Sequence, residues 1–167
     1  MDADRRAALL DRYRAGTGLV VAALEGVTDA DLDARTSPDD WSAREVVHHL
    51  ADSETTSGIR LRRLLVEDEP VIAAYDEGAW ARRLHYDRPV ETSLALFTSV
   101  RAASASLLER LDDADFDRAG THEEDGRYGV ARWLEIYAAH TEDHAAQIRK
   151  ARTASIESAS SGPLSSR

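Results

Sequence analysis

The sequence predicts an all-α fold, a four-helix bundle with a long crossover between its second and third helices. Four long stretches repeat apolar residues at spacings of three and four, the periodicity of amphipathic helices. We find no alternating pattern of useful length that would indicate a β-strand. The segment between the second and third stretches, residues 67–88, is long for a connection in a bundle. We therefore expect it to contain a short helix or to cover a site.

The first two predicted helices cover residues 5–25 and 42–66. Two glycines weaken the first helix locally, but its apolar spacing is regular. Ser42 suits the N-cap of the second helix, and Glu45 three residues later completes a capping-box pattern. The stripe of the first helix comprises Leu10, Tyr13, Thr17, Val21 and Leu24.

The last two predicted helices cover residues 91–111 and 130–152, and Pro89 helps to place the start of the third helix. An acidic turn precedes the second helix at residues 27–33, and a similar one precedes the fourth at residues 111–117. These turns are either ordinary helix caps or the sign of two similar helical hairpins. The two stripes comprise Phe97, Val100, Leu107, Leu108 and Leu111, and then Val130, Leu134, Tyr137, Thr141 and Ile148.

The 167 residues correspond to about one domain, which we assign to residues 1–152. Residues 153–167 contain six serines, a glycine and a proline without a periodic apolar stripe. Such a composition predicts a disordered C-terminal tail outside the bundle.

Composition excludes several classes of function. There are 21 Lys and Arg against 31 Asp and Glu, a net charge of −10, and no segregated basic patch, so nucleic acid is not an expected partner. Cysteine is absent, which removes disulfides, thiolate metal sites and cysteine nucleophiles. Neither a signal peptide nor an apolar run of about 18–20 residues is present, so a cytoplasmic protein without a membrane segment is predicted.

The six histidines differ in their predicted orientation. Each residue advances about 100° around a helix. Measured from Val46, His49 lies at about −60°, on the edge of the apolar face, whereas His48 lies at about 200° and is expected to face solvent. His85 and His122 lie in predicted loops, where we expect both to be exposed.

On the fourth predicted helix, two histidines share the apolar face. Measured from Tyr137, His140 lies at about −60° and His144 at about −20°. Their i, i+4 spacing stacks the two rings one turn apart, which suits two imidazoles that bind one ion at about 2.0–2.1 Å. Two buried imidazoles would otherwise each need hydrogen-bond partners. A plain helical scaffold with incidental histidines remains an alternative.

Three segments resemble the DinB/YfiT-like superfamily over roughly residues 5–152. They are residues 41–53, which include Trp-Ser and His-His-Leu-Ala-Asp, the crossover residues 70–80, and the His-x-x-x-His of residues 140–144. The crossover resembles the YfiT branch, which includes metal-dependent hydrolases and bacillithiol transferases. The resemblance implies a four-helix bundle, commonly a homodimer, with one divalent ion bound by His49, His140 and His144.

The leading hypothesis is a metal-dependent enzyme that acts on a small molecule, as a hydrolase or a thiol S-transferase. The ion would be zinc or nickel, and because the chain has no cysteine, any thiol would come from a cosubstrate of the bacillithiol or mycothiol type. The alternative is a non-catalytic metal-binding stress-response module.

Four further residues are weaker candidates for this site. Asp52 and Glu45 lie about one helical turn on either side of His49, so they could orient it or act as a base. The simpler interpretation is a solvated face and a capping-box glutamate. Tyr75 and Trp80 of the crossover could wall a substrate pocket, or they could only pack against the bundle.

Overall fold

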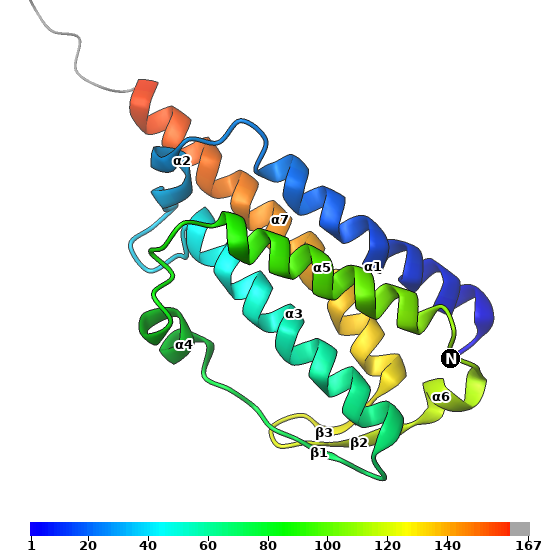
Figure 1. Cartoon of the computed structure of the whole chain (residues 1–167). Coiled ribbons are helices and arrows are strands. Elements are labelled where there is room, and N and C mark those ends of the chain that lie inside the picture. Colours follow the sequence, from blue (N-terminus) through cyan, green and yellow to red (C-terminus); the bar gives the residue numbers. More distant parts are fainter. Residues whose placement is uncertain (161–167) are drawn as a thin grey trace, which may run out of the picture.

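The computed structural model describes residues 1–160 and confirms the four-helix bundle (Figure 1). In the described residues the bundle consists of α1 (Ala3–Ala23), α3 (Ala43–Val66), α5 (Glu91–Leu108) and α7 (Val130–Ser160). Three short helices occupy the connections: α2 (Asp29–Asp33), α4 (Glu77–Arg83) and α6 (Asp113–Asp117). Helix α4 is the short helix expected in the crossover.

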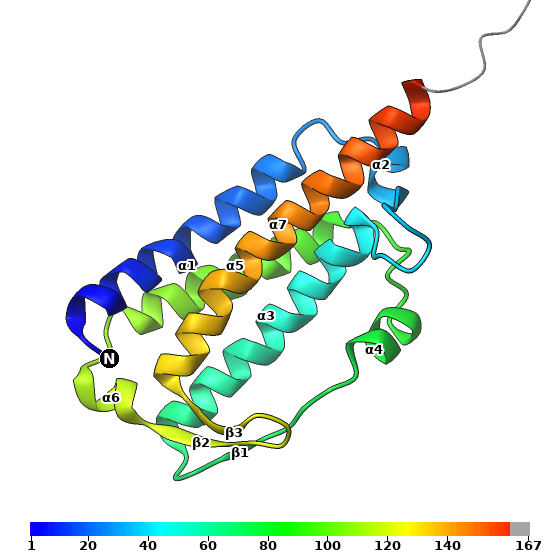
Figure 2. The same cartoon turned by 180° about the vertical axis from the view of Figure 1, so that it is seen from behind.

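The helices α1 and α7 are parallel neighbours. Arg5 pairs with Glu135 near the start of both helices, and Arg12 pairs with Glu142 two turns further along each. Seen from behind, α7 lies between α1 and α3, with α5 on the far side (Figure 2).

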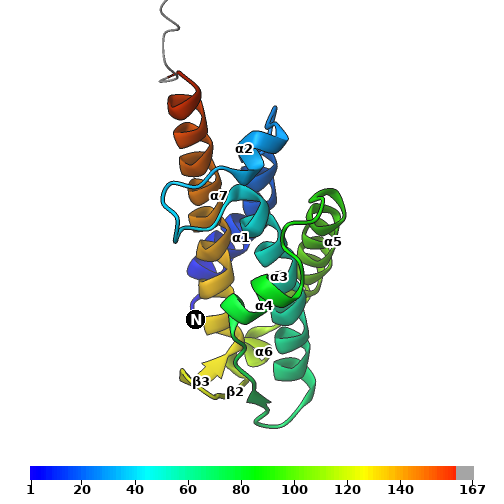
Figure 3. The ribbon, with the colours of Figure 1, turned by 90° about the vertical axis from the view of Figure 1, so that its left-hand side faces the viewer.

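The helices α3 and α5 are also parallel, and the crossover makes this possible. Contacts step forward along both helices, from His48 with Ser93 to Glu54 with Arg101. A helix as long as α3 spans about 36 Å, so an extended chain needs about 11 residues to return to its start. Residues 67–90 provide that length and pass along α3 with α4 (Figure 3).

A small three-stranded sheet, which the sequence analysis did not predict, lies at one end of the bundle. The strands β1 (Val71–Ile72), β2 (Ala119–His122) and β3 (Gly126–Gly129) contain two to four residues, too few to display an alternating pattern. Strand β1 is parallel to β2, and β2 is antiparallel to β3. A Cβ at Gly120 would lie 2.1 Å from the carbonyl oxygen of Pro70, so only glycine fits there. The register pairs Val71 with Thr121 and Ile72 with His122.

Local capping explains where several helices begin. The predicted box is confirmed at α3, where the Ser42 side chain accepts from the Glu45 N–H and the Glu45 carboxylate accepts from the Ser42 N–H. Both acidic turns form short helices with the same kind of capping box. In each half of the bundle a short capped helix therefore connects two long antiparallel helices.

The predicted end of the last helix at Arg152 is wrong. Helix α7 continues to Ser160, into the segment predicted to be a disordered tail, and residues 161–167 lie outside the described residues. Ala151 and Ile148 in its last buried turns pack against the rest of the bundle, and Arg152 donates to the Glu25 carbonyl oxygen. No helix within residues 1–160 is both long enough and apolar enough to cross a membrane.

Among the described residues, two apolar clusters form the core. One surrounds Trp133, Tyr13 and Leu61, and the other surrounds Phe97 and Ile148. Between them lies a layer of buried polar side chains, which contains the candidate site.

Candidate metal centre

Three histidine side chains from two neighbouring helices meet in the polar layer. His49 comes from α3, His140 and His144 come from α7, and one ring nitrogen of each lies within 4.8 Å of the others. The Nε2 atom of His140 lies 3.2 Å from Nε2 of His49 and 3.1 Å from Nε2 of His144. The prediction that these three histidines face inward is therefore confirmed.

Helix geometry places the three rings together. His140 and His144 stack one turn apart on α7, with ring centroids separated by 4.4 Å. The antiparallel α3 brings His49 alongside them, with its ring 5.2 Å from that of His140 and 4.8 Å from that of His144. The spacing within α7 could be read from the sequence, whereas the level of α3 relative to α7 could not.

Burial keeps the cluster uncharged. Loss of hydration lowers the pKa of His49 to about 3 and that of His140 to about 2, and repulsion from the neighbouring rings adds to both shifts. Loss of hydration also lowers the pKa of His144, against an opposing hydrogen bond to Gln147. At neutral pH all three imidazoles are therefore neutral, the form that binds metal ions.

A hydrogen bond fixes the orientation of one ring. Nδ1 of His144 lies 2.9 Å from Oε1 of Gln147, and because an amide oxygen only accepts, Nδ1 carries the proton. Nε2 of His144 therefore presents a lone pair to the centre of the cluster. Nδ1 of His140 is buried without a hydrogen-bond partner.

The donor set fits a divalent cation. Two nitrogen ligands at 2.0–2.1 Å from one tetrahedral ion lie about 3.4 Å apart. The separations of 3.1 and 3.2 Å between Nε2 atoms are close to that value. Neutral imidazoles that turn lone pairs toward one another in a buried site repel, and a shared cation would remove this repulsion.

Aromatic side chains border the cluster. The Trp41 ring meets His49 edge-on with 4.9 Å between centroids, and the Tyr137 ring lies 5.8 Å from that of His140. Both contacts restrict the orientation of the imidazole rings.

A second polar set, which the sequence analysis missed, lies beside the histidines. Arg101 donates to the Glu54 carboxylate at 2.8 Å, and both side chains are only 1% exposed. Arg101 also donates to the carbonyl oxygens of Tyr13 and Tyr137, and the Tyr13 hydroxyl donates to Glu54. The sequence did contain a signal for this pair, because Glu54 on α3 and Arg101 on α5 are charged residues next to the apolar stripe of their helices.

The expectation that His48 faces solvent is wrong. His48 is fully buried, with Nδ1 2.8 Å from the Ser93 hydroxyl and Nε2 2.9 Å from the Arg88 carbonyl oxygen. Helix α3 packs against α7 on one side and α5 on another, so a single buried face described it incompletely.

The two loop histidines differ from each other. His85 is exposed, as predicted. His122 was expected to be exposed, but it is only 6% exposed because it lies in β2, with its ring 5.5 Å from that of Tyr128. A strand too short to recognise from the sequence caused this error.

The weaker candidates have separate roles. Glu45 belongs to the capping box and pairs with Arg35, which supports the simpler interpretation given above. The Asp52 carboxylate is half-buried and accepts from the Tyr86 hydroxyl at 2.7 Å. The Tyr86 ring in turn lies 6.4 Å from that of Trp41, which borders His49.

Tyr75 and Trp80 of the crossover pack on each other, with 4.5 Å between ring centroids. Tyr75 lines a cavity next to the cluster, together with Tyr137. Burial raises the pKa of Tyr75 to about 12, and the neighbouring Ser53 hydroxyl opposes this shift. Ser53 lies one turn from His49 on α3.

The fold and the site together define a class of protein, a bundle of two parallel helix pairs with a three-histidine cluster between α3 and α7. The sequence profile of the DinB superfamily matches residues 12–148, and the chain belongs to this superfamily.

Similar proteins have related names. A protein of Oceanobacillus iheyensis named "Putative metal-dependent hydrolase" is 37% identical over 122 residues, 73% of this chain and 71% of the relative. A Bacillus mycoides protein of the same name is 32% identical over 130 residues, 78% of this chain and 75% of the relative.

A solved structure shares the fold. YfiT from Bacillus subtilis, described as "a probable metal-dependent hydrolase with an unusual four-helix bundle topology", matches with a TM-score of 0.84 at 28% identity. The match covers 95% of this chain and 90% of YfiT.

Proposed function

We propose that the chain is a metal-dependent hydrolase that holds one divalent ion through His49, His140 and His144. The observation that carries this proposal is the close approach of three neutral ring nitrogens, from one buried and two half-buried histidines, without a counter-charge among them. The names of the relatives and of the structural neighbour support it. Zinc and nickel suit three nitrogen donors.

The chain's own residues prepare the site for hydrolysis. A divalent ion bound there would supply a Lewis acid that lowers the pKa of water to about 7. Gln147 holds His144 in the binding tautomer, and Trp41 and Tyr137 pack against the rings of His49 and His140. We assign Asp52, which is positioned by Tyr86, as the candidate proton acceptor on the same helix as His49.

Transfer to a small thiol is the second candidate reaction. The chain has no cysteine, so a sulfur nucleophile would have to come from a cosubstrate such as bacillithiol or mycothiol. Neutral nitrogen donors leave the full charge of the ion to stabilise a thiolate.

Turnover of the zinc-loaded and nickel-loaded protein tests the proposal. We would offer a panel of aryl esters and amides, first with water alone and then with low-molecular-weight thiols and an aryl electrophile. Metal-dependent hydrolysis that is lost in His144→Ala and kept in His85→Ala would support the hydrolase. Turnover only with a thiol would instead identify a transferase.

Full metal occupancy without turnover in either assay would favour the non-catalytic metal-binding module.

We also propose that the chain forms a homodimer, as the family resemblance implies. Light scattering of the purified protein would give twice the mass of the 18.4 kDa chain, whereas a monomer mass would contradict this.

A further inference from the structure

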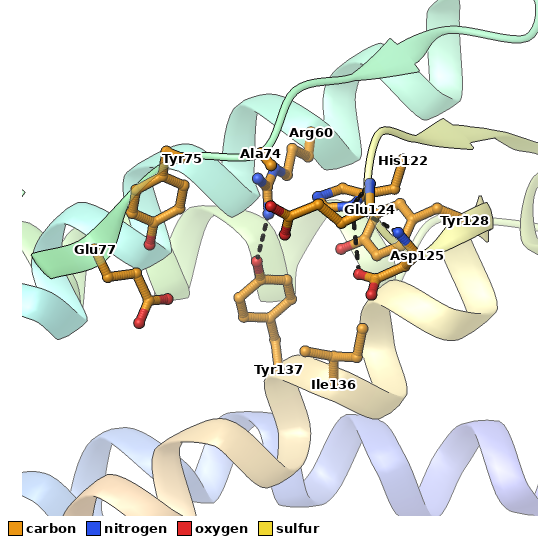
Figure 4. Close-up of a pocket in the computed structure, with 10 residues that line it drawn as sticks. All are labelled: Arg60, Ala74, Tyr75, Glu77, His122, Glu124, Asp125, Tyr128, Ile136 and Tyr137. Carbon is orange, nitrogen blue, oxygen red and sulfur yellow. Dashed lines mark hydrogen bonds and ion pairs between the residues drawn. The ribbon is translucent and has the colours of Figure 1, made fainter. Parts of the chain in front are cut away.

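A cavity of about 200 Å³ lies beside the three-histidine cluster (Figure 4). Its walls come from α3, α7, the crossover and the β2–β3 hairpin. Tyr137 belongs to both places, since it lines the cavity and its ring lies 5.8 Å from that of His140. Tyr137 therefore lies between the cavity and the proposed metal site.

Arg60 brings a positive charge to the wall of the cavity. The guanidinium donates to the Ala73 carbonyl oxygen at 2.6 Å and to the Tyr137 hydroxyl at 3.4 Å. In the described part of the chain, no carboxylate oxygen lies within ion-pair distance of it, whereas the buried Arg101 and Arg44 are both paired with acids. A half-buried guanidinium that meets only neutral acceptors can still bind an anion.

A buried hydroxyl group in the same wall lacks a well-formed hydrogen bond. Tyr128 is only 2% exposed, and within the described residues its hydroxyl has only a weak interaction with the hydroxyl of Tyr137. Figure 4 shows the Tyr137 hydroxyl turned toward the guanidinium of Arg60 and Tyr128 beside His122 at the hairpin. Because a poorly satisfied buried hydroxyl is costly, it indicates a ligand that accepts a hydrogen bond there.

The rim of the cavity has the opposite charge. Glu77 of α4 and Glu124 of the β2–β3 turn are both exposed and line the opening. Asp125 is also on the rim, where it lies 3.3 Å from Nδ1 of His122. The inner wall thus offers a cation and a hydroxyl donor, and the rim offers carboxylates.

The direction of Arg60 relates the cavity to the cluster. Arg60 lies eleven residues after His49 on α3, about three turns, which returns it to nearly the same face of the helix. Side chains on a helix lean toward its N-terminus, which for Arg60 is the direction of His49.

We propose that this cavity recognises a small substrate with an amino-acid-like group, one carboxylate and one ammonium. Arg60 and the Tyr128 hydroxyl hold the carboxylate, and Glu77 and Glu124 face the ammonium. This assignment rests on the proposed function only in that the remainder of the substrate reaches the three-histidine cluster past Tyr137. A dianion would be disfavoured by the rim, and a simple amine would leave Arg60 without an anion.

Three probes with the same carbon skeleton test this assignment: β-alanine, propionate and propylamine. Each would be titrated into the zinc-loaded full-length chain, and binding would be followed by amide chemical shifts in NMR. We expect β-alanine to shift Tyr128 and Tyr137 with saturation, and propionate to bind several-fold more weakly. Propylamine should leave these signals unmoved. Equal binding of β-alanine and propionate, or stronger binding of propylamine, would overturn the assignment.

Variants separate recognition from folding. Arg60→Gln should weaken β-alanine binding by at least about tenfold, because a charge-assisted hydrogen bond is lost. Arg62→Gln is the matched control, since Arg62 lies on the same helix but donates to the Gly58 carbonyl oxygen and lines a different groove. Tyr128→Phe keeps the buried ring and should weaken binding several-fold. Unchanged binding in both Arg60→Gln and Tyr128→Phe would contradict the proposal.

The metal site and the cavity can fail separately. His140→Ala should lose zinc and still bind β-alanine, because the carboxylate contacts do not involve the histidine. A protein that binds zinc and shows no β-alanine shifts would overturn the cavity assignment and leave the proposed function standing. A protein that binds β-alanine but never binds zinc would overturn the proposed function and leave the cavity assignment standing.

Discussion

Two buried polar clusters lie side by side in the middle of the bundle. They differ in how many of their polar atoms have a hydrogen-bond or ion-pair partner within the cluster. In the first, Arg101 is bound by Glu54 and by two backbone carbonyl oxygens, and Glu54 also accepts from Tyr13. In the second, three neutral imidazoles face one another through like atoms, and the Nδ1 atom of His140 has no partner.

The difference separates structure from function. A buried polar set with internal partners needs nothing from outside, so it serves to fix the packing of the four helices. A polar set whose ring nitrogens meet only one another, with the Nδ1 atom of His140 left without a partner, can accept a cation without losing any other interaction. The second cluster is therefore the one that we expect to bind an ion.

The largest effect is expected from breaking the first cluster. Arg101→Met would leave the Glu54 carboxylate buried and unpaired, which costs about 3–5 kcal/mol of the free energy of unfolding. Urea denaturation measures this loss. The double variant with Glu54→Gln should recover a large part of it, and a loss below about 1 kcal/mol in the single variant would show that the pair is not buried as described.

Removal of the ion should have the next largest effect. A ligand present at about 1,000 times its dissociation constant stabilises the native state by about 4 kcal/mol, so chelation should lower the melting temperature. The His140→Ala variant should melt at the same temperature with and without chelator. The Arg101→Met variant, although less stable, should still melt at a lower temperature after chelation if the two clusters are independent. A chelator-induced shift in His140→Ala as large as that of the wild type would contradict the assignment of the ion to the second cluster.

Acidification should affect the metal-free second cluster. The folded-state pKa of His49 is lowered to about 3 and that of His140 to about 2, below the ordinary value of 6.5. Between the folded-state pKa values and 6.5, the unfolded chain therefore binds more protons than the folded chain. The free energy of unfolding is highest above about pH 6.5 and falls as the pH drops below that value. Denaturation of the metal-free protein at a series of pH values measures the slope. His140→Leu should flatten it, and an unchanged slope would show that His140 is not the group responsible.

The smallest effect is expected at the helix cap. Glu45→Ala removes one half of the α3 capping box and should cost about 1 kcal/mol, with no change in metal content. Thermal melting and elemental analysis of the same sample report both quantities. Exposed Glu91, in the first turn of α5 without a side-chain cap, is the matched control position. Loss of metal in Glu45→Ala would show that Glu45 contributes to the metal site.

Features that depend on the spacing of residues along one helix could be predicted well from the sequence. Contacts between different helices could not. The sequence predicted the four helices, the α3 cap and the three inward histidines, because each depends on spacing within one element. It failed for His48, since α3 is covered on more than one side, and for His122, whose strand is too short to recognise. The Glu54–Arg101 pair was missed because two charges in separate apolar stripes become partners only when α3 and α5 pack in parallel.

Metal stoichiometry is the most direct test of the central claim. Elemental analysis of the purified chain after reconstitution with zinc should give one ion per chain, and the ion should be lost in His49→Ala, His140→Ala and His144→Ala. The His48→Ala variant, which alters the adjacent but differently directed histidine, should retain it if it folds, as checked by circular dichroism. A wild-type chain that binds no zinc, or a His140→Ala variant that keeps a full equivalent, would contradict the account.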